Sequence, residues 1–213
     1  MNLFKNILIL GAHPDDIEFG MGGTLARLMR INEISLKLIV FSNCDESLPH
    51  DFAPGTLIEE CKRSFEVYGI DSSQILFENF KVRNFHRSRQ EILEIIVKEF
   101  NGGSFDTVFC PSSSDIHQDH SVLSQEAIRA CKKSTLLGYE MPWNALQSKK
   151  NVFFEIQDED LAVKVASIKE YRSQGQRPYA SALFQESLAL STGVSVGKPL
   201  AEGFELIRGI YPS

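Results

Sequence analysis

Two segments far apart in the chain carry histidines and aspartates at spacings that suit metal chemistry. Residues 11–16 read Gly-Ala-His-Pro-Asp-Asp, and residues 115–120 read Asp-Ile-His-Gln-Asp-His. A catalytic zinc site takes three His or carboxylate ligands and keeps one position open. His13 and Asp16 are close enough for one loop to supply two ligands, and Pro14 restricts that loop. The third ligand must come from elsewhere, and the second segment offers two histidines.

Both segments follow predicted strands. Residues 7–10 and 107–110 are short, continuous apolar runs, which are typical of buried parallel strands. Ligands of open α/β sheets bind outside the carboxyl ends of the strands. A single surface histidine usually just faces water, but polar residues clustered at two strand ends indicate one shared site.

The rest of the chain alternates short apolar runs with helical patterns, which predicts an α/β fold. Further strands are predicted at residues 36–41, 74–77 and 152–156, with a last strand or extended tail at 204–210. Helices are predicted at residues 20–32, 56–68, 88–100, 121–131, 158–173 and 181–190, and a loop at 191–199. This order favours a mostly parallel sheet with helices on both faces. Because no convincing linker interrupts it, we expect residues 1–213 to form a single domain with a C-terminal elaboration.

Composition narrows the class of protein. The 213 residues carry a formal net charge of -6 with a pI near 5.4, which argues against nucleic acid or an anionic membrane as the main partner. No segment is long enough to cross a membrane, and the N-terminal apolar run is too short for a secretory signal. The four cysteines lie far apart, a spacing that predicts buried, reduced thiols. We therefore expect a cytoplasmic protein.

Gly20, Gly22 and Gly23 leave two interpretations open. A glycine-rich turn that opens a helix could bind phosphate at the helix N-terminus. The alternative is a tight turn or close packing. The spacing is not that of a dinucleotide-binding loop directly after a strand, because residues 11–16 intervene. This difference favours the packing interpretation.

Four stretches resemble motifs of one enzyme family. Residues 11–24 resemble the signature of the PIG-L (LmbE-like) family of zinc-dependent N-acetylglucosaminyl deacetylases, and residues 117–120 resemble its His-x-Asp-His motif. Residues 169–174 resemble its Lys-x-x-x-Ser-Gln stretch, and residues 201–205 its closing Ala-Glu-x-Phe. The order of these matches is that of the family, and they span nearly the whole chain. The form Asp-Asp-Ile-Glu is most similar to the bacillithiol-pathway branch.

The resemblance implies a Rossmann-like fold and a metal centre. It also implies hydrolysis of the N-acetyl group of an N-acetylglucosamine-type sugar or sugar conjugate, which releases acetate and a free amine. Matched position by position, His13, Asp16 and His120 are the expected ligands of Zn²⁺. Such a ligand set also accepts other divalent metals such as Fe²⁺.

The same match assigns the catalytic residues. Asp15 matches the general base of the family. His117 matches the histidine that stabilises or protonates the reaction centre, and Asp119 would orient a neighbouring histidine. Spacing alone leaves open an exchange of roles between Asp15 and its neighbour Asp16.

The substrate-binding residues are less defined. Many relatives carry an arginine early in the helix predicted from residue 56, where this chain has none. Asn43 and Asp45 follow the second predicted strand, so they could contact sugar hydroxyls or form an ordinary polar loop. Arg83 belongs to a small basic cluster that could meet a phosphate or carboxylate of the substrate. Trp143, the single tryptophan, could stack on a sugar ring or serve only packing.

Three function classes follow. The first is the sugar N-deacetylase, and the second is a related zinc amidohydrolase that acts on a different N-acylated amine. The third is a non-catalytic sugar-binding protein, which the intact set of histidines and aspartates disfavours. The expected partner is a small-molecule sugar, with neither nucleic acid nor membrane. Assembly into a homo-oligomer is compatible with the resemblance.

Overall fold

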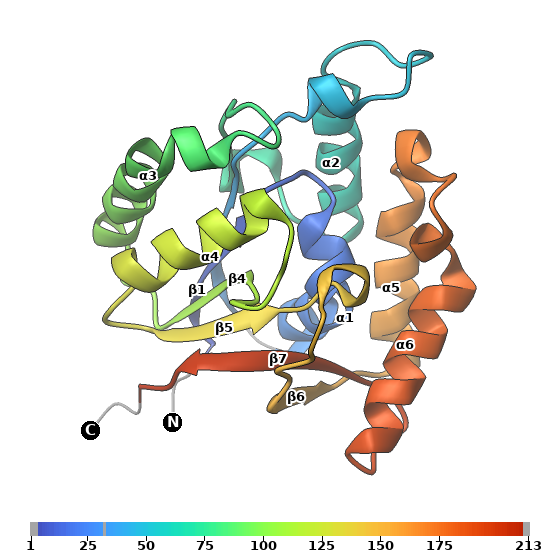
Figure 1. Ribbon diagram of the computed structural model, residues 1–213. Coiled ribbons are helices and arrows are strands. Elements are labelled where there is room, and N and C mark those ends of the chain that lie inside the picture. Colours follow the sequence, from blue (N-terminus) through green and yellow to red (C-terminus); the bar gives the residue numbers. More distant parts are fainter. Residues whose placement is uncertain (1–3, 32, 211–213) are drawn as a thin grey trace.

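The computed structural model describes residues 4–31 and 33–210. In this part of the chain a seven-stranded sheet has the strand order β3-β2-β1-β4-β5-β7-β6, and helices cover both of its faces (Figure 1). The strands are β1 (Asn6–Gly11), β2 (Ser35–Val40), β3 (Ile75–Phe77), β4 (Thr107–Pro111), β5 (Thr135–Tyr139), β6 (Val152–Glu155) and β7 (Ala201–Arg208). The helices are α1 (Asp16–Ile31), α2 (Thr56–Val67), α3 (Arg89–Gly102), α4 (Gln118–Ala130), α5 (Asp158–Lys169) and α6 (Ala182–Ser195). Strands β1 to β5 are mutually parallel, and β7 is antiparallel to β5 and β6. The predicted α/β fold with a mostly parallel sheet is confirmed.

Alternate residues of β1 supply two separate hydrophobic cores. Ile7 and Ile9 pack on the face that α1, α2 and α5 cover. Leu8 and Leu10 pack on the opposite face with residues of α3 and α4. Successive side chains of a strand point to opposite faces, so a strand covered on both sides needs the continuous apolar run seen here.

Strand β5 is absent from the sequence prediction. Its sequence, Thr-Leu-Leu-Gly-Tyr, is short and contains a glycine, a residue type that is depleted in strands. The structure shows why glycine is needed, because a Cβ atom at Gly138 would lie 2.8 Å from the Cα of Ser112. Tyr139 at the end of β5 donates a hydrogen bond of 2.8 Å to the carbonyl of Leu10 in β1.

Helix α1 is kinked, and a side chain caps its second half. Met21 has φ -149° and ψ 18°, outside helical values, so the amides just after it lack helical partners. The carboxylate of Glu202 accepts the amides of Gly23 (3.1 Å) and Thr24 (2.6 Å). Lys164 pairs with the same carboxylate at 2.7 Å. The negative charge at the start of this half of the helix therefore belongs to Glu202 of β7, which lies in the stretch that resembles the closing Ala-Glu-x-Phe motif.

The packing interpretation of the glycines in residues 20–23 is confirmed. A Cβ atom at Gly20 would lie 2.4 Å from the ring of Tyr139. At Gly22 it would lie 2.6 Å from the hydroxyl of Tyr68. These glycines let α1 approach its neighbours closely.

Several helix boundaries differ from the prediction. Helix α1 begins at Asp16 rather than residue 20, and α4 begins at Gln118 rather than residue 121. Helix α5 ends at Lys169, whereas α6 continues to Ser195 through residues predicted as loop. Gly193 in that stretch would lower helix propensity, but it lets α6 pack on Leu200, whose Cα lies 2.8 Å from where a Cβ would stand. Tertiary packing overrides local propensity there.

Two expectations from composition can be compared with the structure. None of the helices in the described ranges has the length and apolar character that crossing a bilayer requires. The four cysteines are buried free thiols, as predicted. Burial raises the pKa of Cys131 to about 12, which suits an inert thiol.

Candidate active site

A cavity of about 330 Å³ opens at the carboxyl ends of the parallel strands. Each of β1 to β5 contributes a lining residue from the segment that follows it. In chain order these residues include Asp15, Cys44, Arg83, His117 and Asn144. The two polar segments predicted to converge therefore meet at one edge of the sheet.

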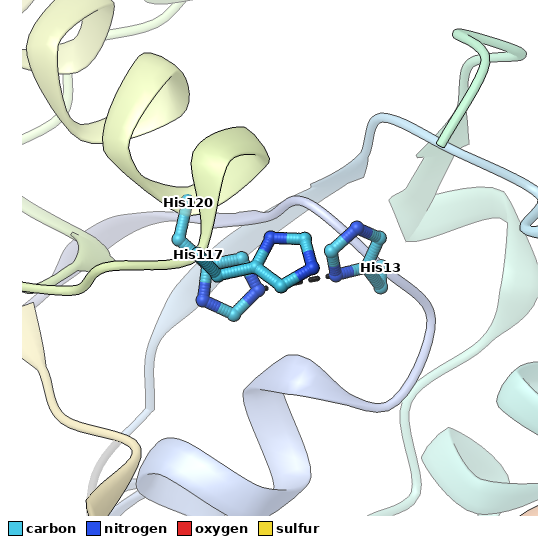
Figure 2. Close-up of side chains that lie close together, drawn as sticks. All are labelled: His13, His117 and His120. Carbon is cyan, nitrogen blue, oxygen red and sulfur yellow. Dashed lines mark hydrogen bonds between the residues drawn. The ribbon is translucent and has the colours of Figure 1, made fainter. Parts of the chain in front are cut away.

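The residues predicted as metal ligands lie together in this cavity. Nδ1 of His13 lies 3.1 Å from Nε2 of His120. The two oxygens of Asp16 lie 3.4 Å from that His13 nitrogen and 3.2 Å from that His120 nitrogen. Figure 2 shows the imidazoles of His13, His117 and His120 gathered where the loop after β1 meets the start of α4. Ring nitrogens of these three histidines lie within 4.8 Å of one another.

Two further carboxylates orient the facing imidazoles. Oδ2 of Asp119 lies 3.1 Å from Nε2 of His13, and Oδ2 of Asp115 lies 2.8 Å from Nδ1 of His120. A carboxylate only accepts, so these two ring nitrogens donate. If both rings are neutral, Nδ1 of His13 and Nε2 of His120 then carry lone pairs that face each other and the two oxygens of Asp16. At 3.1 Å such a pair requires a cation, either a proton or a metal ion, between them.

The electrostatics of the site favour positive charge at this point. Burial alone lowers the pKa of His13, but Asp16 and Asp119 outweigh it and raise the pKa to about 9. Burial likewise lowers the pKa of His120, and Asp16 and Asp115 raise it to about 10. The pKa of Asp16 is held well below its usual range, since His120 and His13 outweigh the effect of burial. The site is built to hold a cation.

His117 has a different environment from the other two histidines. It is the N-cap of α4, and its Nδ1 accepts the amide of Asp119 at 3.3 Å. Burial and the neighbouring His120 and His13 lower the pKa of His117 to about 4. A neutral imidazole that accepts at Nδ1 carries its proton on Nε2. His117 therefore offers a hydrogen-bond donor near neutral pH without being positively charged.

Asp15 lines the cavity beside Asp16, and the two carboxylates differ in electrostatic environment. Burial raises the pKa of Asp15, and repulsion by Asp16 raises it further, while Arg177 and His13 oppose both effects. A carboxylate with a raised pKa accepts a proton more readily than a free aspartate does. Of the two aspartates, Asp15 is thus the better proton acceptor.

Buried side chains support the loop from below. The carboxyl group of Glu18, which is 0% exposed, lies 2.5 Å from the Ser64 hydroxyl and 2.7 Å from the Tyr171 hydroxyl. Tyr171 also donates to the carbonyl of Pro14, and Cys61 contacts that carbonyl at 3.2 Å. Burial raises the pKa of Glu18 to about 8, against the opposing hydrogen bonds of Ser64 and Tyr171. Glu18 and Tyr171 belong to the family-like motifs, which is the signal that could have identified them.

Asn43 and Asp45, two of the residues predicted to bind substrate, instead form hydrogen bonds within the loop after β2. The amide group of Asn43 bonds the carboxylate of Asp45 at 2.8 Å, and Asp45 also accepts the amide of Gly55 at 2.7 Å. Neither Asn43 nor Asp45 is among the described residues that line the cavity. Both side chains hold the loop after β2, so the structure does not bring them into the site.

Arg83, in contrast, does line the cavity. Its backbone has φ 64°, a left-handed conformation that is unusual for a residue with a side chain. The amide of Arg83 donates to Oδ2 of Asp119 at 2.5 Å, and its guanidinium donates to the Ser47 hydroxyl at 2.7 Å. Gln118 donates to the carbonyl of Arg83 at 3.0 Å. These contacts hold the strained residue at the cavity.

One wall of the cavity comes from the segment after α5. Trp143 stacks on Tyr179 with ring centroids 4.0 Å apart and an interplanar angle of 10°. Gln174, Arg177 and Tyr179 line the cavity with Trp143. Gln174 lies in the Ser-Gln match, whereas no pattern in the sequence indicated Arg177 or Tyr179. The two interpretations of Trp143 are compatible, because it both packs on an aromatic ring and faces the cavity.

Comparisons with known proteins show which family this chain resembles. The family model described as GlcNAc-PI de-N-acetylase (PIG-L) matches residues 8–131. The uncharacterized deacetylase YaiS of Escherichia coli (strain K12) is 31% identical over 180 residues, which cover 81% of this chain and 93% of that protein. Diacetylchitobiose deacetylase of Thermococcus kodakarensis is 27% identical over 244 residues, covering 99% and 86%.

A solved structure shows the same fold. N,N'-diacetylchitobiose deacetylase from Pyrococcus horikoshii matches with a TM-score of 0.74 and 22% identity, covering 94% of this chain and 83% of that chain. The family model includes both histidine-bearing segments of the cavity. The chain belongs to the PIG-L family, the family of GlcNAc-PI de-N-acetylase.

Proposed function

We propose that the protein is a metal-dependent hydrolase that removes the N-acetyl group from an N-acetylglucosamine-type sugar or sugar conjugate. The observation that best supports a bound metal is that the ring nitrogens of His13 and His120 face each other at 3.1 Å. The support for the reaction comes from family membership and from relatives named as deacetylases.

The residues present fit a divalent metal. Nitrogen and oxygen ligands of a tetrahedral zinc ion lie about 3.3 Å apart, since each bond is about 2.0–2.1 Å long. Nδ1 of His13 and Nε2 of His120 are 3.1 Å apart, and each lies 3.4 or 3.2 Å from a different oxygen of the Asp16 carboxylate. Asp115 and Asp119 supply the outer carboxylates that ligating histidines usually have. We infer that His13, Asp16 and His120 hold Zn²⁺, or Fe²⁺ as an alternative. Such an ion supplies a Lewis acid that polarises a carbonyl and lowers the pKa of water towards about 7.

Asp15 then serves as general base. It lies in the cavity next to Asp16, and burial raises its pKa. In the proposed reaction it takes a proton from the attacking water as the new C–O bond forms at the acetyl carbon. When the C–N bond breaks, Asp15 returns that proton to the leaving nitrogen. The products are acetate and a free amine.

In the proposed reaction, His117 stabilises charge on the acetyl oxygen. With Nδ1 accepting the amide of Asp119, its Nε2–H is the available donor. A donor directed at a developing oxyanion contributes about 3 kcal/mol to catalysis. The lowered pKa of His117 favours this donor role over the delivery of a full proton. The Asp119 carboxylate acts through His13, and its backbone amide contacts His117, so Asp119 is a positioning residue rather than a catalytic one.

Similar proteins and the aromatic wall of the cavity support a sugar as the substrate. Two similar proteins are named as deacetylases of diacetylchitobiose. Trp143 and Tyr179 give the cavity an aromatic side, and aromatic faces suit the apolar faces of sugar rings. An amidohydrolase that acts on another N-acylated amine would use the same reacting residues, so the alternative differs in substrate only. The bacillithiol branch stays a prediction.

The test is acetate release from a panel of N-acetylglucosamine conjugates, including nucleotide sugars, with and without a chelator. We expect at least one sugar to release acetate, chelation to abolish the release, and added Zn²⁺ to restore it. His120→Ala should lose metal and activity together. His50→Ala, which removes an exposed histidine, should retain both. Acetate release that persists under chelation would exclude the metal-dependent mechanism, and release only from non-sugar amides would favour the alternative.

A further inference from the structure

Two arginines line the cavity from different parts of the chain. Arg83 follows β3, and Arg177 follows α5. Four other arginines of the described residues, Arg30, Arg63, Arg89 and Arg129, form ion pairs with carboxylates, whereas Arg27, Arg87, Arg172 and Arg208 do not. Within residues 4–31 and 33–210, neither Arg83 nor Arg177 has a carboxylate within ion-pair distance. Arg83 and Arg177 differ from the other arginines without an ion pair because both line the cavity, in a chain whose net charge is -6.

The guanidinium of Arg177 is held in place by aromatic contacts. It lies over the ring of Tyr179, 5.7 Å from the centroid, and donates a hydrogen bond to the Tyr179 hydroxyl. Tyr179 is in turn stacked on Trp143. Phe19 meets both rings edge-on, at 5.3 Å and 5.7 Å between centroids. Such contacts reduce the rotamer freedom that a free arginine would lose on binding a ligand.

The backbone that carries Arg177 is anchored as well. Glu60 of α2, which is buried, accepts the amide of Ser173 at 3.0 Å and its hydroxyl at 2.6 Å. The amide of Arg177 donates to the carbonyl of Gln174 at 3.0 Å. The cation is therefore fixed from its backbone to its guanidinium.

We propose that Arg177 and Arg83 together bind an anionic substituent, a phosphate or a carboxylate, on the substrate. This inference rests on the proposed function, since it concerns the substrate of that same cavity. Guanidinium groups match the geometry of both anions. Helix α2 lines the cavity through Leu57 and carries no arginine in its first turns, so the arginines of the described lining come from the segments after β3 and α5. A substrate with such a group would bind more tightly than its neutral counterpart.

The single tryptophan makes the test direct. Trp143 lines the cavity and is the only tryptophan of the chain, so its fluorescence reports on ligands that enter. The titration uses chelated protein, in which binding is measured whether or not turnover occurs. The probes are neutral N-acetylglucosamine, its 1- and 6-phosphates, and N-acetylmuramic acid, which carries a carboxylate.

We expect at least one anionic probe to bind about tenfold or more tightly than neutral N-acetylglucosamine, with an affinity that falls as salt is added. Arg177→Gln and Arg83→Gln should each remove most of this difference. Arg172→Gln and Arg87→Gln, exposed neighbours outside the cavity lining, are the matched controls and should preserve it. The phosphate and carboxylate probes show which of the two anions is preferred.

Equal affinity for neutral and anionic probes, or a preference that survives both cavity variants, would overturn the inference. That result is separable from failure of the proposed function. Acetate release without an anion preference would retain the function and remove the inference. Tight, arginine-dependent binding of an anionic sugar without acetate release would do the opposite.

Discussion

Oδ2 of Asp119 lies 3.1 Å from Nε2 of His13 and accepts the backbone amide of Arg83 at 2.5 Å. One carboxylate oxygen thus links a proposed metal ligand to the left-handed residue that faces the cavity. Arg83 pays a conformational cost at φ 64° that its surroundings must offset. The orientation of the histidine and the position of the arginine therefore depend on the same side chain.

Replacing Asp119 with Asn should weaken metal binding by about 10–100-fold, the usual effect of removing an outer carboxylate from a ligating histidine. Asp115→Asn should do the same through His120. Asp51→Asn, in an exposed loop, is the control. Metal affinity is measured by competition with a chromogenic chelator. Unchanged affinity in both site variants would show that the carboxylates do not orient metal ligands.

Asp15→Asn should retain stoichiometric metal and lower kcat by about 10²–10⁴-fold, because the amide cannot accept the proton of water. Metal content and acetate release are measured on the same preparation. A variant that loses its metal instead would assign the ligand role to Asp15 and the base role to Asp16.

Glu18→Gln should change how stability depends on pH. The folded pKa of Glu18 is raised to about 8 by burial, whereas an unfolded glutamate titrates near about 4.3. Between these values the folded protein keeps a proton that the unfolded chain releases. The contribution of Glu18 to the free energy of unfolding of the wild type therefore decreases as pH rises towards 8. Glutamine does not titrate, and the free energy of unfolding of the variant relative to wild type should therefore increase from about pH 5 to pH 8.

Urea denaturation of chelated protein at several pH values measures this difference. Glu66→Gln, at an exposed position of α2, is the control and should show no such trend. A difference that stays constant with pH would mean that Glu18 is ionised in the folded protein.

Gly20→Ala should destabilise the fold by about 1–3 kcal/mol, the usual cost of overpacking. The new Cβ would lie 2.4 Å from the ring of Tyr139, which is fully buried and tied to Leu10 by its hydroxyl. Gly102→Ala adds a Cβ with no neighbour within 4 Å and should cost much less. Thermal unfolding compares the two variants, and equal melting temperatures would contradict the packing role.

Much of the fold could be predicted from periodicity, because most of its strands are continuous apolar runs and its helices have regular apolar faces. Periodicity does not reveal strand β5, since its glycine allows close contact with Ser112 and is a residue type that strands disfavour. The sequence pattern also predicts too late a start for α1, because the His-Pro-Asp-Asp stretch resembles a loop although its last residue, Asp16, already begins the helix. For β5, a partner distant in sequence decides the local structure.

The site divides in a similar way. His13, Asp16 and His120 follow strand ends and lie in named motifs, so the sequence was sufficient to bring them together. Arg177 and Tyr179 reach the cavity only because the segment after α5 folds back against α2. No motif or spacing in the sequence predicts that the segment after α5 folds back against α2.

The cap of the second half of α1 has a consequence for synthesis on the ribosome. The hydrogen bond from Gly23 to Glu202 joins residues 179 positions apart. The ribosome therefore synthesises α1 long before Glu202, whose carboxylate accepts the hydrogen bonds of the amides that follow the kink. We expect nascent chains that stop before β7 to present an uncapped α1 to chaperones and proteases. Limited proteolysis of stalled chains of increasing length would show when α1 becomes protected, and full protection before residue 202 emerges would contradict this order of maturation.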